Sequence, residues 1–326
     1  MKKNENVSFK KIFILFFLEI IFAVPLLKNY FFLELKNQIF KKKTKTFNKN
    51  FDYAHYQKNV INEKMKKYAY WMLDESHIYF INGLLRKIKP KNCLEIGVAR
   101  GGSSIIILNA IKDIPDSQLI SIDLFKNINN DKIGYLVEKE YPELMSKWKL
   151  FVGDMPHKFL TKINLKFDFL FLDSAHVSPG EFFNLIESLP FLNENAVVVL
   201  HDINWHYMRI LLPNITLYNA KVMPTQIYLM SSLIGEKMIL DNDSKNFDNI
   251  GVVCLASNQK KYYLNYFLLI MTLWQYMPSD EQLSGLREFI YKYYGDKIFL
   301  KIFDNSVDYN KKFFFNLNSG KYNLTN

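Results

Sequence analysis

The sequence predicts an α/β protein: a doubly wound, mostly parallel sheet with an antiparallel hairpin at one edge and helical N- and C-terminal additions. Two observations predict this class. Short apolar runs alternate with segments of helical length, which is typical of a parallel sheet covered by helices on both faces. A polar, acidic or glycine-containing turn follows each apolar run, and ligands bind beyond the carboxyl ends of such strands.

The first expected element is a helix over roughly Ile61–Ile88, which ends at Lys89-Pro90 because the residue before a proline disfavours helical backbone. Apolar runs then follow, and the one at Phe167–Asp173 (FDFLFLD) reads as a strand buried on both faces. The expected parallel strands are Asn92–Gly97, Gln118–Leu124, Trp148–Gly153, Phe167–Asp173 and Ala196–His201.

Helices are expected over Ser103–Ile114 and over Pro179–Leu192, which starts with proline and has a glutamate in its first turn. Two further strands predict the antiparallel hairpin at the sheet edge, and two aromatic-rich helices follow it. These elements are expected at Glu236–Leu240, Ile250–Ser257, Lys260–Tyr276 and Ser279–Tyr294.

The chain is expected to divide into four parts. They are a basic and apolar N-terminal segment (1–47), a helical lead-in (48–90), the α/β core (91–257) and a C-terminal helical extension (258–326).

Composition excludes several classes of protein. A hydrophobic fraction of 49% and an aromatic fraction of 16% exclude a disordered chain. The net charge of +10 lies mostly in the first 50 residues, which hold eleven lysines and three glutamates, so we expect no nucleic-acid groove on the body. Cys93 and Cys254 both lie in apolar runs, which favours buried, reduced thiols in a cytoplasmic protein.

The N-terminal segment favours a membrane surface. Its apolar run, Ile12–Leu27, is shorter than the ~20 residues of a clean span and is interrupted by Glu19. Basic residues flank the run, so residues 10–45 are expected to bind the inner face of the cell membrane. Alternatively, Ile12–Leu35 is a helix that packs on the body or on a second copy of the chain.

The turn CLEIGVARGGSS (Cys93–Ser104) gives the first functional signal. As a G-x-G-x-x-G dinucleotide motif it would place Ala99 where a glycine lets the backbone approach a pyrophosphate. The spacing E-x-G-x-x-x-G fits Glu95, Gly97 and Gly101 without a substitution. Here the chain resembles class I S-adenosylmethionine-dependent methyltransferases, whose first motif has that form.

The resemblance implies a Rossmann-like methyltransferase sheet with S-adenosylmethionine as cofactor. It implies that Glu95 lies near the methionine end, that Asp123 takes the ribose hydroxyls, and that VGDM (Val152–Met155) holds the adenine. The implied cofactor residues are Glu95, Gly97, Ala99, Arg100, Gly101, Gly102, Asp123, Asp154 and Met155.

LDSAHVSPGEFFNLIESLPFLNENAVVVLHD (Leu172–Asp202) gives the second signal. It resembles the D-x-x-H … L-x-x-G-G … HD pattern of a subfamily that includes macrolide-sugar O-methyltransferases and proteins related to cephalosporin hydroxylase. The similarity covers roughly Leu84–Asn204, and it departs at Asn193-Glu194-Asn195, where the family has glycines.

A sugar hydroxyl needs activation, because it is a poor nucleophile until its proton is removed. A divalent cation such as Mg²⁺ is expected on Asp173 and Asp202, with His176 as the general base. His201 stands where metal-dependent relatives have an acid; it is a further candidate ligand, and an imidazole suits transition metals better than magnesium. Asn204 is another candidate oxygen donor, and residues 205–235 are expected to shape the acceptor pocket.

The function expected is O-methylation of a small molecule or glycan, specifically of a sugar in a cell-envelope or lipid-linked glycan. Two alternatives stay open: an NAD-dependent oxidoreductase on the same sheet, and a catalytically silent scaffold with the methyltransferase fold. A homo-oligomer is also left open.

Overall fold

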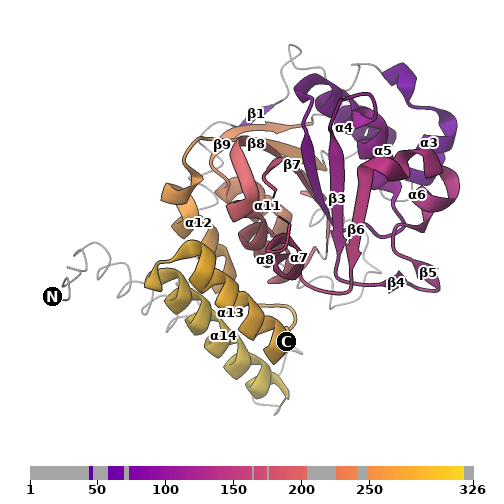
Figure 1. Cartoon of the computed structure of the whole chain (residues 1–326). Coiled ribbons are helices and arrows are strands. Elements are labelled where there is room, and N and C mark those ends of the chain that lie inside the picture. Colours follow the sequence, from indigo (N-terminus) through magenta and orange to yellow (C-terminus); the bar gives the residue numbers. More distant parts are fainter. Residues whose placement is uncertain are drawn as a thin grey trace.

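The computed structural model describes residues 44–46, 58–69, 73–163, 165–174, 176–203, 225–240 and 249–318. These residues form an eight-stranded sheet with helices on both faces (Figure 1). The strand order is β1-β9-β10-β8-β7-β2-β3-β6. The strands are β1 (Thr44–Thr46), β2 (Asn92–Ile96), β3 (Gln118–Asp123), β6 (Trp148–Val152), β7 (Phe167–Leu172), β8 (Leu192–His201), β9 (Gly235–Ile239) and β10 (Ile250–Leu255).

The predicted fold class is confirmed. Strands β6, β3, β2, β7 and β8 are parallel neighbours, and β10 pairs antiparallel with both β8 and β9. The expected edge hairpin is therefore β9 and β10. Strand β1 adds a short parallel pairing to β9, which the sequence did not predict.

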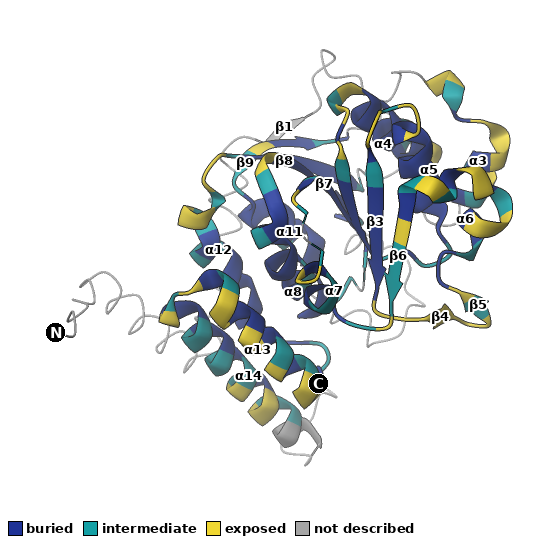
Figure 2. Cartoon of the chain, in the orientation of Figure 1, coloured by how far each residue is buried: buried dark blue, intermediate teal, exposed yellow. Residues whose placement is uncertain are grey.

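Two layers of helices cover the sheet. Helices α3 (Glu63–Ala69), α4 (Glu75–Ile88), α5 (Gly102–Ile111) and α6 (Tyr135–Glu140) bury one face. Helices α7 (Pro156–Leu160), α8 (Gly180–Ser188), α11 (Thr225–Ser232), α12 (Tyr263–Phe267), α13 (Asp280–Tyr294) and α14 (Lys297–Asn318) lie on the other side. Figure 2 shows the central strands almost wholly buried between these layers.

Shorter elements complete the fold. They are the two-stranded ribbon β4 (Asn127–Ile128) and β5 (Asp131–Lys132), and the 3₁₀ turns η3 (Lys58–Val60), η4 (Pro142–Lys147), η5 (Leu189–Phe191), η6 (Gln259–Tyr262) and η7 (Leu268–Met271).

Two helix predictions were wrong in extent. The expected single helix Ile61–Ile88 is two helices, α3 and α4, which pack on α5. The expected helix Lys260–Tyr276 is a series of short turns that ends at Met271, and Thr272–Pro278 has no helical or strand structure. Thr272 ends the last turn in extended backbone (ψ 165°), which stops the helical hydrogen bonding at this point.

The predicted C-terminal helix Ser279–Tyr294 is confirmed as α13. Its first turn is a capping box, in which the Ser279 side chain accepts from the backbone of Gln282 and the Gln282 side chain accepts from the backbone of Ser279. Helix α14 was not predicted, and it lies beside α13 in Figure 1.

The predictions for residues 1–43, Asn204 and residues 205–224 lie outside the described residues. Of the segment 205–235 that was expected to shape the acceptor pocket, residues 225–235 are described, and none of them lines the cavity at the strand ends. Among the helices that are described, none combines the length and apolar character needed to cross a membrane.

Candidate functional site

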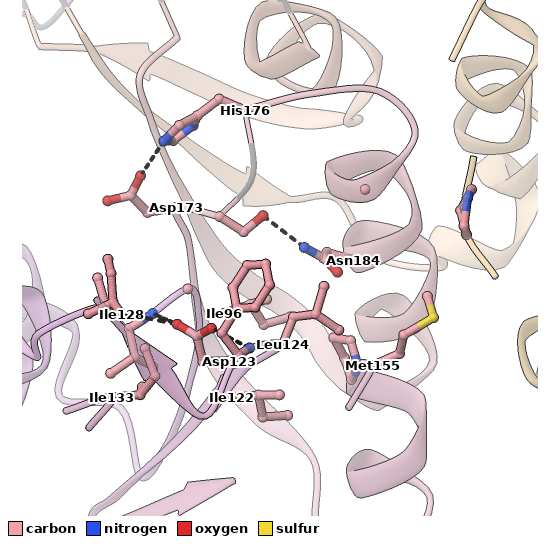
Figure 3. A pocket seen from close by; sticks show the side chains of 18 of the residues that line it. Ile96, Ile122, Asp123, Leu124, Ile128, Ile133, Met155, Asp173, His176 and Asn184 are labelled. Carbon is pink, nitrogen blue, oxygen red and sulfur yellow. Dashed lines mark hydrogen bonds and ion pairs between the residues drawn. The ribbon is translucent and has the colours of Figure 1, made fainter. Parts of the chain in front are cut away.

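A cavity of about 550 Å³ lies at the carboxyl ends of the parallel strands. This is the size range of small-molecule sites, roughly 300–1,000 Å³. Its walls come from the turn after β2, the ends of β3, β7 and β8, the start of α7, and the loop before α13 (Figure 3). The strand ends are therefore gathered into one site, as the topology predicts.

The turn after β2 is shaped by close packing against β7. Gly97 has a φ of +90°, and a Cβ on it would lie 1.8 Å from the backbone oxygen of Asp173. Only glycine fits this position. The turn holds the end of β7, with Asp173, next to the end of β2.

The Asp123 side chain is hydrogen-bonded to the backbone of the same turn. Its Oδ2 accepts hydrogen bonds from the backbone N–H of Val98 (2.9 Å) and Ala99 (3.1 Å), and its Oδ1 accepts from Phe125 N–H (2.9 Å). Since a carboxylate has about four acceptor positions, one remains for a ligand hydroxyl. Gly97, Ala99 and Asp123 all line the cavity.

Glu95 has a different environment from the one expected. Its carboxylate is fully buried and accepts hydrogen bonds from the hydroxyls of Ser103 (2.7 Å), Ser104 (2.6 Å) and Ser121 (2.6 Å). Burial raises the pKa of Glu95 to about 7, against the lowering effect of the three hydroxyls. The structure places Glu95 behind the turn, where it ties α5 to β2 and β3, and not in the cavity wall.

Of the other residues predicted to bind the cofactor, only some line the cavity. Met155 lines it, whereas the lining does not include Arg100, Gly101, Gly102 or Asp154. Arg100 lies 3.8 Å from Asp131 on β5. Gly101 has left-handed backbone and precedes α5. A Cβ on Gly102 would lie 2.9 Å from the backbone of α3. The Asp154 side chain accepts a hydrogen bond from the backbone N–H of Met155.

Asp173, His201 and Asp202 meet at the ends of β7 and β8. His201 Nδ1 lies 3.4 Å from Asp173 Oδ1 and 3.5 Å from Asp202 Oδ1, and one ligand atom of each of the three lies within 4.8 Å of the others. Two carboxylates and an imidazole at this spacing are a donor set for a divalent ion. All three residues line the cavity.

His176 faces this cluster from the loop after β7. Its Nε2 lies 3.2 Å from Asp202 Oδ2 and 3.5 Å from Asp173 Oδ1, and its Nδ1 lies 3.3 Å from Glu181 Oε1. Burial lowers the pKa of His176, but Glu181, Asp173 and Asp202 together outweigh it and raise the pKa to about 10. Figure 3 shows His176 and Asp173 pointing toward each other.

The structure adds a histidine that the sequence did not indicate. His77 on α4 is buried, and its Nδ1 lies 3.2 Å from His201 Nε2. Burial, and then the nearby His201, lower the pKa of His77 to about 3, so it is neutral and its Nδ1 can accept a hydrogen bond from the N–H of His201 Nε2. Burial lowers the pKa of His201, but the charges of Asp173 and Asp202, which face its Nδ1, outweigh burial and raise it.

The C-terminal extension also contributes to the site. Tyr276, Met277, Pro278 and Gln282 line the cavity, about 100 residues after His176 in the sequence. The aromatic content near Tyr276 is compatible with a core helix, so it gave no signal of this role. These residues were missed because only the tertiary fold returns this loop to the sheet.

Comparison with known proteins gives one family match. Residues 94–203 match the family described as "Methyltransferase domain", and this span runs from β2 to just past β8. No curated protein sequence matches the chain.

Several solved structures are similar to the chain. One is the O-methyltransferase TomG from Streptomyces achromogenes, involved in tomaymycin synthesis and solved with S-adenosylmethionine (17% identity, 60% of this chain and 91% of that chain, TM-score 0.45). Another is an O-methyltransferase from Bacillus cereus, solved with S-adenosylhomocysteine (14%, 60% and 92%, TM-score 0.46). A third is a putative caffeoyl-CoA O-methyltransferase from Staphylococcus aureus (16%, 58% and 90%, TM-score 0.43).

Proposed function

We propose that this chain, whose residues 94–203 form a class I methyltransferase domain, transfers the methyl group of S-adenosylmethionine to a hydroxyl oxygen. The methyltransferase class is the one predicted, and the family match confirms it. One observation favours oxygen as the methyl acceptor. The turn after β2, where the cofactor would bind, and His176 with Asp173 and Asp202 all line the same cavity.

The residues present fit the cofactor. Asp123 keeps an acceptor position for a ribose hydroxyl, and apolar side chains line the same part of the cavity: Ile96, Ile122, Leu124, Phe125 and Met155. Phe125 is 66% exposed although it is aromatic, which suits a side chain that a planar adenine covers. S-adenosylmethionine supplies an electrophilic methyl group there.

The residues also fit a divalent ion. Asp173, Asp202 and His201 would hold it, and His77 would keep His201 in the tautomer that presents Nδ1. Because the set includes an imidazole, we propose a transition metal such as Mn²⁺ in preference to Mg²⁺. Such an ion would lower the pKa of a hydroxyl near it and would offset the carboxylate charge around His176.

His176 then acts as the base. Its Nε2 is directed at the Asp173 and Asp202 end of the cavity, where the acceptor hydroxyl would lie and where Nε2 would take the hydroxyl proton. S-adenosylmethionine would supply the methyl group by breaking its sulfur–methyl bond and would leave as S-adenosylhomocysteine. The C-terminal loop supplies Tyr276, Met277 and Pro278 to the wall of the same cavity.

The acceptor we propose is a sugar in a cell-envelope or lipid-linked glycan. The support is the sequence resemblance of Leu172–Asp202 to sugar O-methyltransferases, together with the basic, apolar N-terminal segment. Tyr276 gives the cavity an aromatic ring of the kind that stacks on a sugar face.

Calorimetric titration of S-adenosylhomocysteine into the full chain tests the cofactor, with NAD as the competing ligand. Micromolar binding of S-adenosylhomocysteine alone supports the proposal, and binding of NAD alone contradicts it.

Methyl transfer from labelled S-adenosylmethionine to a cell-envelope glycan fraction tests the acceptor. We expect His176→Ala to lose this transfer and keep cofactor binding. Unchanged transfer by His176→Ala would remove His176 from the mechanism. If the wild type binds the cofactor but transfers no methyl group, a silent scaffold is favoured.

The same protein titrated with Mn²⁺ and followed by electron paramagnetic resonance tests the metal. We expect the free Mn²⁺ signal to disappear at one equivalent in the wild type and to persist in Asp173→Asn. A persistent signal in both would contradict the metal part of the proposal alone.

A further inference from the structure

One buried carboxylate near the cavity has no part in the reaction as proposed above. Glu181 lies in the first turn of α8 and is 0% exposed. Its Oε1 is 3.3 Å from His176 Nδ1, on the side of the imidazole opposite to Asp173 and Asp202. A buried carboxylate is costly unless it is hydrogen-bonded, so its partners are informative.

Glu181 is held from a second helix. Thr225 Oγ1 donates to Glu181 Oε2 (2.7 Å), and the side-chain amide of Gln226 donates to Glu181 Oε1. Both donors lie at the start of α11, which packs on α8. The carboxylate is therefore fixed between two helices, and the remaining acceptor capacity of Oε1 faces His176.

The histidine needs such a support. His176 has a φ of 52°, in the left-handed region that a side chain with a Cβ seldom adopts. A neutral imidazole also has two tautomers, and which nitrogen keeps the proton is set by the hydrogen bond of the other nitrogen. Asp173 and Asp202 do not favour one tautomer of His176 over the other, because a carboxylate accepts a hydrogen bond from either ring nitrogen.

We propose that Glu181 is the positioning residue of the base: its carboxylate accepts a hydrogen bond from the Nδ1–H of His176, keeps the proton on Nδ1 and thereby keeps Nε2 directed at the acceptor hydroxyl. This inference rests on the proposed function of His176 as the base. It assigns a second task to α11, whose Thr225 and Gln226 keep the carboxylate of Glu181 in place.

Helix α8 offers a matched control. Glu187, six residues further along, is also 0% exposed and also contacts a histidine, since His157 Nδ1 lies 2.5 Å from Glu187 Oε1. His157 does not belong to the described wall of the cavity. The two glutamates are alike in burial, helix and partner type, and they differ in whether the histidine faces the cavity.

The first test is spectroscopic and needs no acceptor. Each Glu–His hydrogen bond should give a strongly downfield Nδ1 proton resonance in protein labelled with ¹⁵N-histidine. We expect Glu181→Gln to move the His176 resonance upfield, because a neutral amide oxygen is a weaker acceptor than a carboxylate, and to leave that of His157 unchanged; Glu187→Gln should do the reverse. A His176 resonance that keeps its wild-type position in Glu181→Gln would overturn the proposal.

The second test is kinetic and uses transfer to the cell-envelope glycan fraction. We expect Glu181→Gln to lower kcat by roughly 10- to 100-fold, as for partners that orient a catalytic group, with KM and S-adenosylhomocysteine affinity unchanged. Glu187→Gln should keep the wild-type kcat. If Glu181→Gln does not fold, Thr225→Val, which removes one donor to the carboxylate, should show a smaller loss of the same kind.

A double-mutant cycle separates positioning from mere stability. In the His176→Ala background, Glu181→Gln should cause no further loss, because the residue it acts through is gone. Equal losses in both backgrounds would overturn the positioning role. If His176→Ala keeps full turnover, the proposed function of His176 as the base is wrong. If His176→Ala is inactive but Glu181→Gln has a normal kcat, the base stands and only the positioning role of Glu181 is wrong.

Discussion

Three side chains of the site are carried on left-handed backbone although none is glycine. Ala99, His176 and Asp202 have φ values of 46°, 52° and 57°. Each such residue costs roughly 1–3 kcal/mol, and it persists only where its surroundings hold it. Here the support is visible: Asp123 binds the N–H of Ala99, Glu181 contacts His176, and the Asn249 side chain donates to Asp202.

Glu95 leads to a prediction about pH and stability. Its pKa is about 7 in the folded protein, against the ordinary glutamate value of 4.5, so the folded state binds a proton more tightly than the unfolded state. The stability from this group is full below pH 4.5 and is lost as the pH rises toward 7, by about 3 kcal/mol. We expect urea unfolding to show this decline in the wild type and a smaller decline in Glu95→Gln.

The comparison must use the difference between the two proteins at each pH, since other groups titrate in both. Parallel curves for the two proteins across the pH range from 4.5 to 7 would show that Glu95 is ionised in the fold and would contradict the prediction.

At the scale of elements, the loop Thr272–Pro278 fixes the turn that carries His176. The backbone N–H of Gln275 donates to Ser178 O (2.8 Å), and the backbone N–H of Ser178 donates to Gln275 Oε1 (2.8 Å). The hydroxyls of Ser178 and Thr272 lie 3.1 Å apart. The C-terminal extension thus holds the His176 turn through this loop, while Gln282 of α13 contributes to the cavity wall.

Gln275→Ala should therefore lower turnover more than it lowers stability. It leaves the buried N–H of Ser178 without its side-chain acceptor, which costs about 1–3 kcal/mol and loosens the His176 turn. We expect a several-fold lower kcat with folding intact, measured by methyl transfer and by thermal unfolding.

Ser279→Ala is the control for this prediction, because it removes the cap of α13 at a similar cost of about 1 kcal/mol and touches no part of that turn. Equal turnover in Gln275→Ala and Ser279→Ala would contradict the positioning role of the loop.

At the scale of the whole molecule, charge and site lie in different parts of the chain. The first 50 residues carry a net charge of +8, close to the whole excess of the protein, while the cavity is acidic. We expect the full chain to sediment with vesicles that contain anionic lipid, and a variant without residues 1–43 to stay in solution. The deletion keeps β1, so the sheet edge is intact.

Neutral vesicles provide the control for charge, and binding to them should be weaker. If the shortened protein still sediments with anionic vesicles, the body binds the membrane and the N-terminal segment is not the anchor.

The sequence by itself determined the parallel strands, the edge hairpin and the residues at the strand ends. These follow from local information: buried strands are apolar runs, and topology brings their carboxyl ends to one edge. Gly97, Ala99, Asp123, Met155, Asp173, His176, His201 and Asp202 line one cavity as a result.

Only the tertiary structure decided which polar residues face that cavity and which face the core. Glu95 lies one residue from the end of β2, yet packing directs its carboxylate to three serines. His77 and Tyr276 lie far from the motifs in sequence and reach the site through α4 and the C-terminal loop. A single sequence shows no such contacts, because they depend on how helices pack across the sheet and not on any local period.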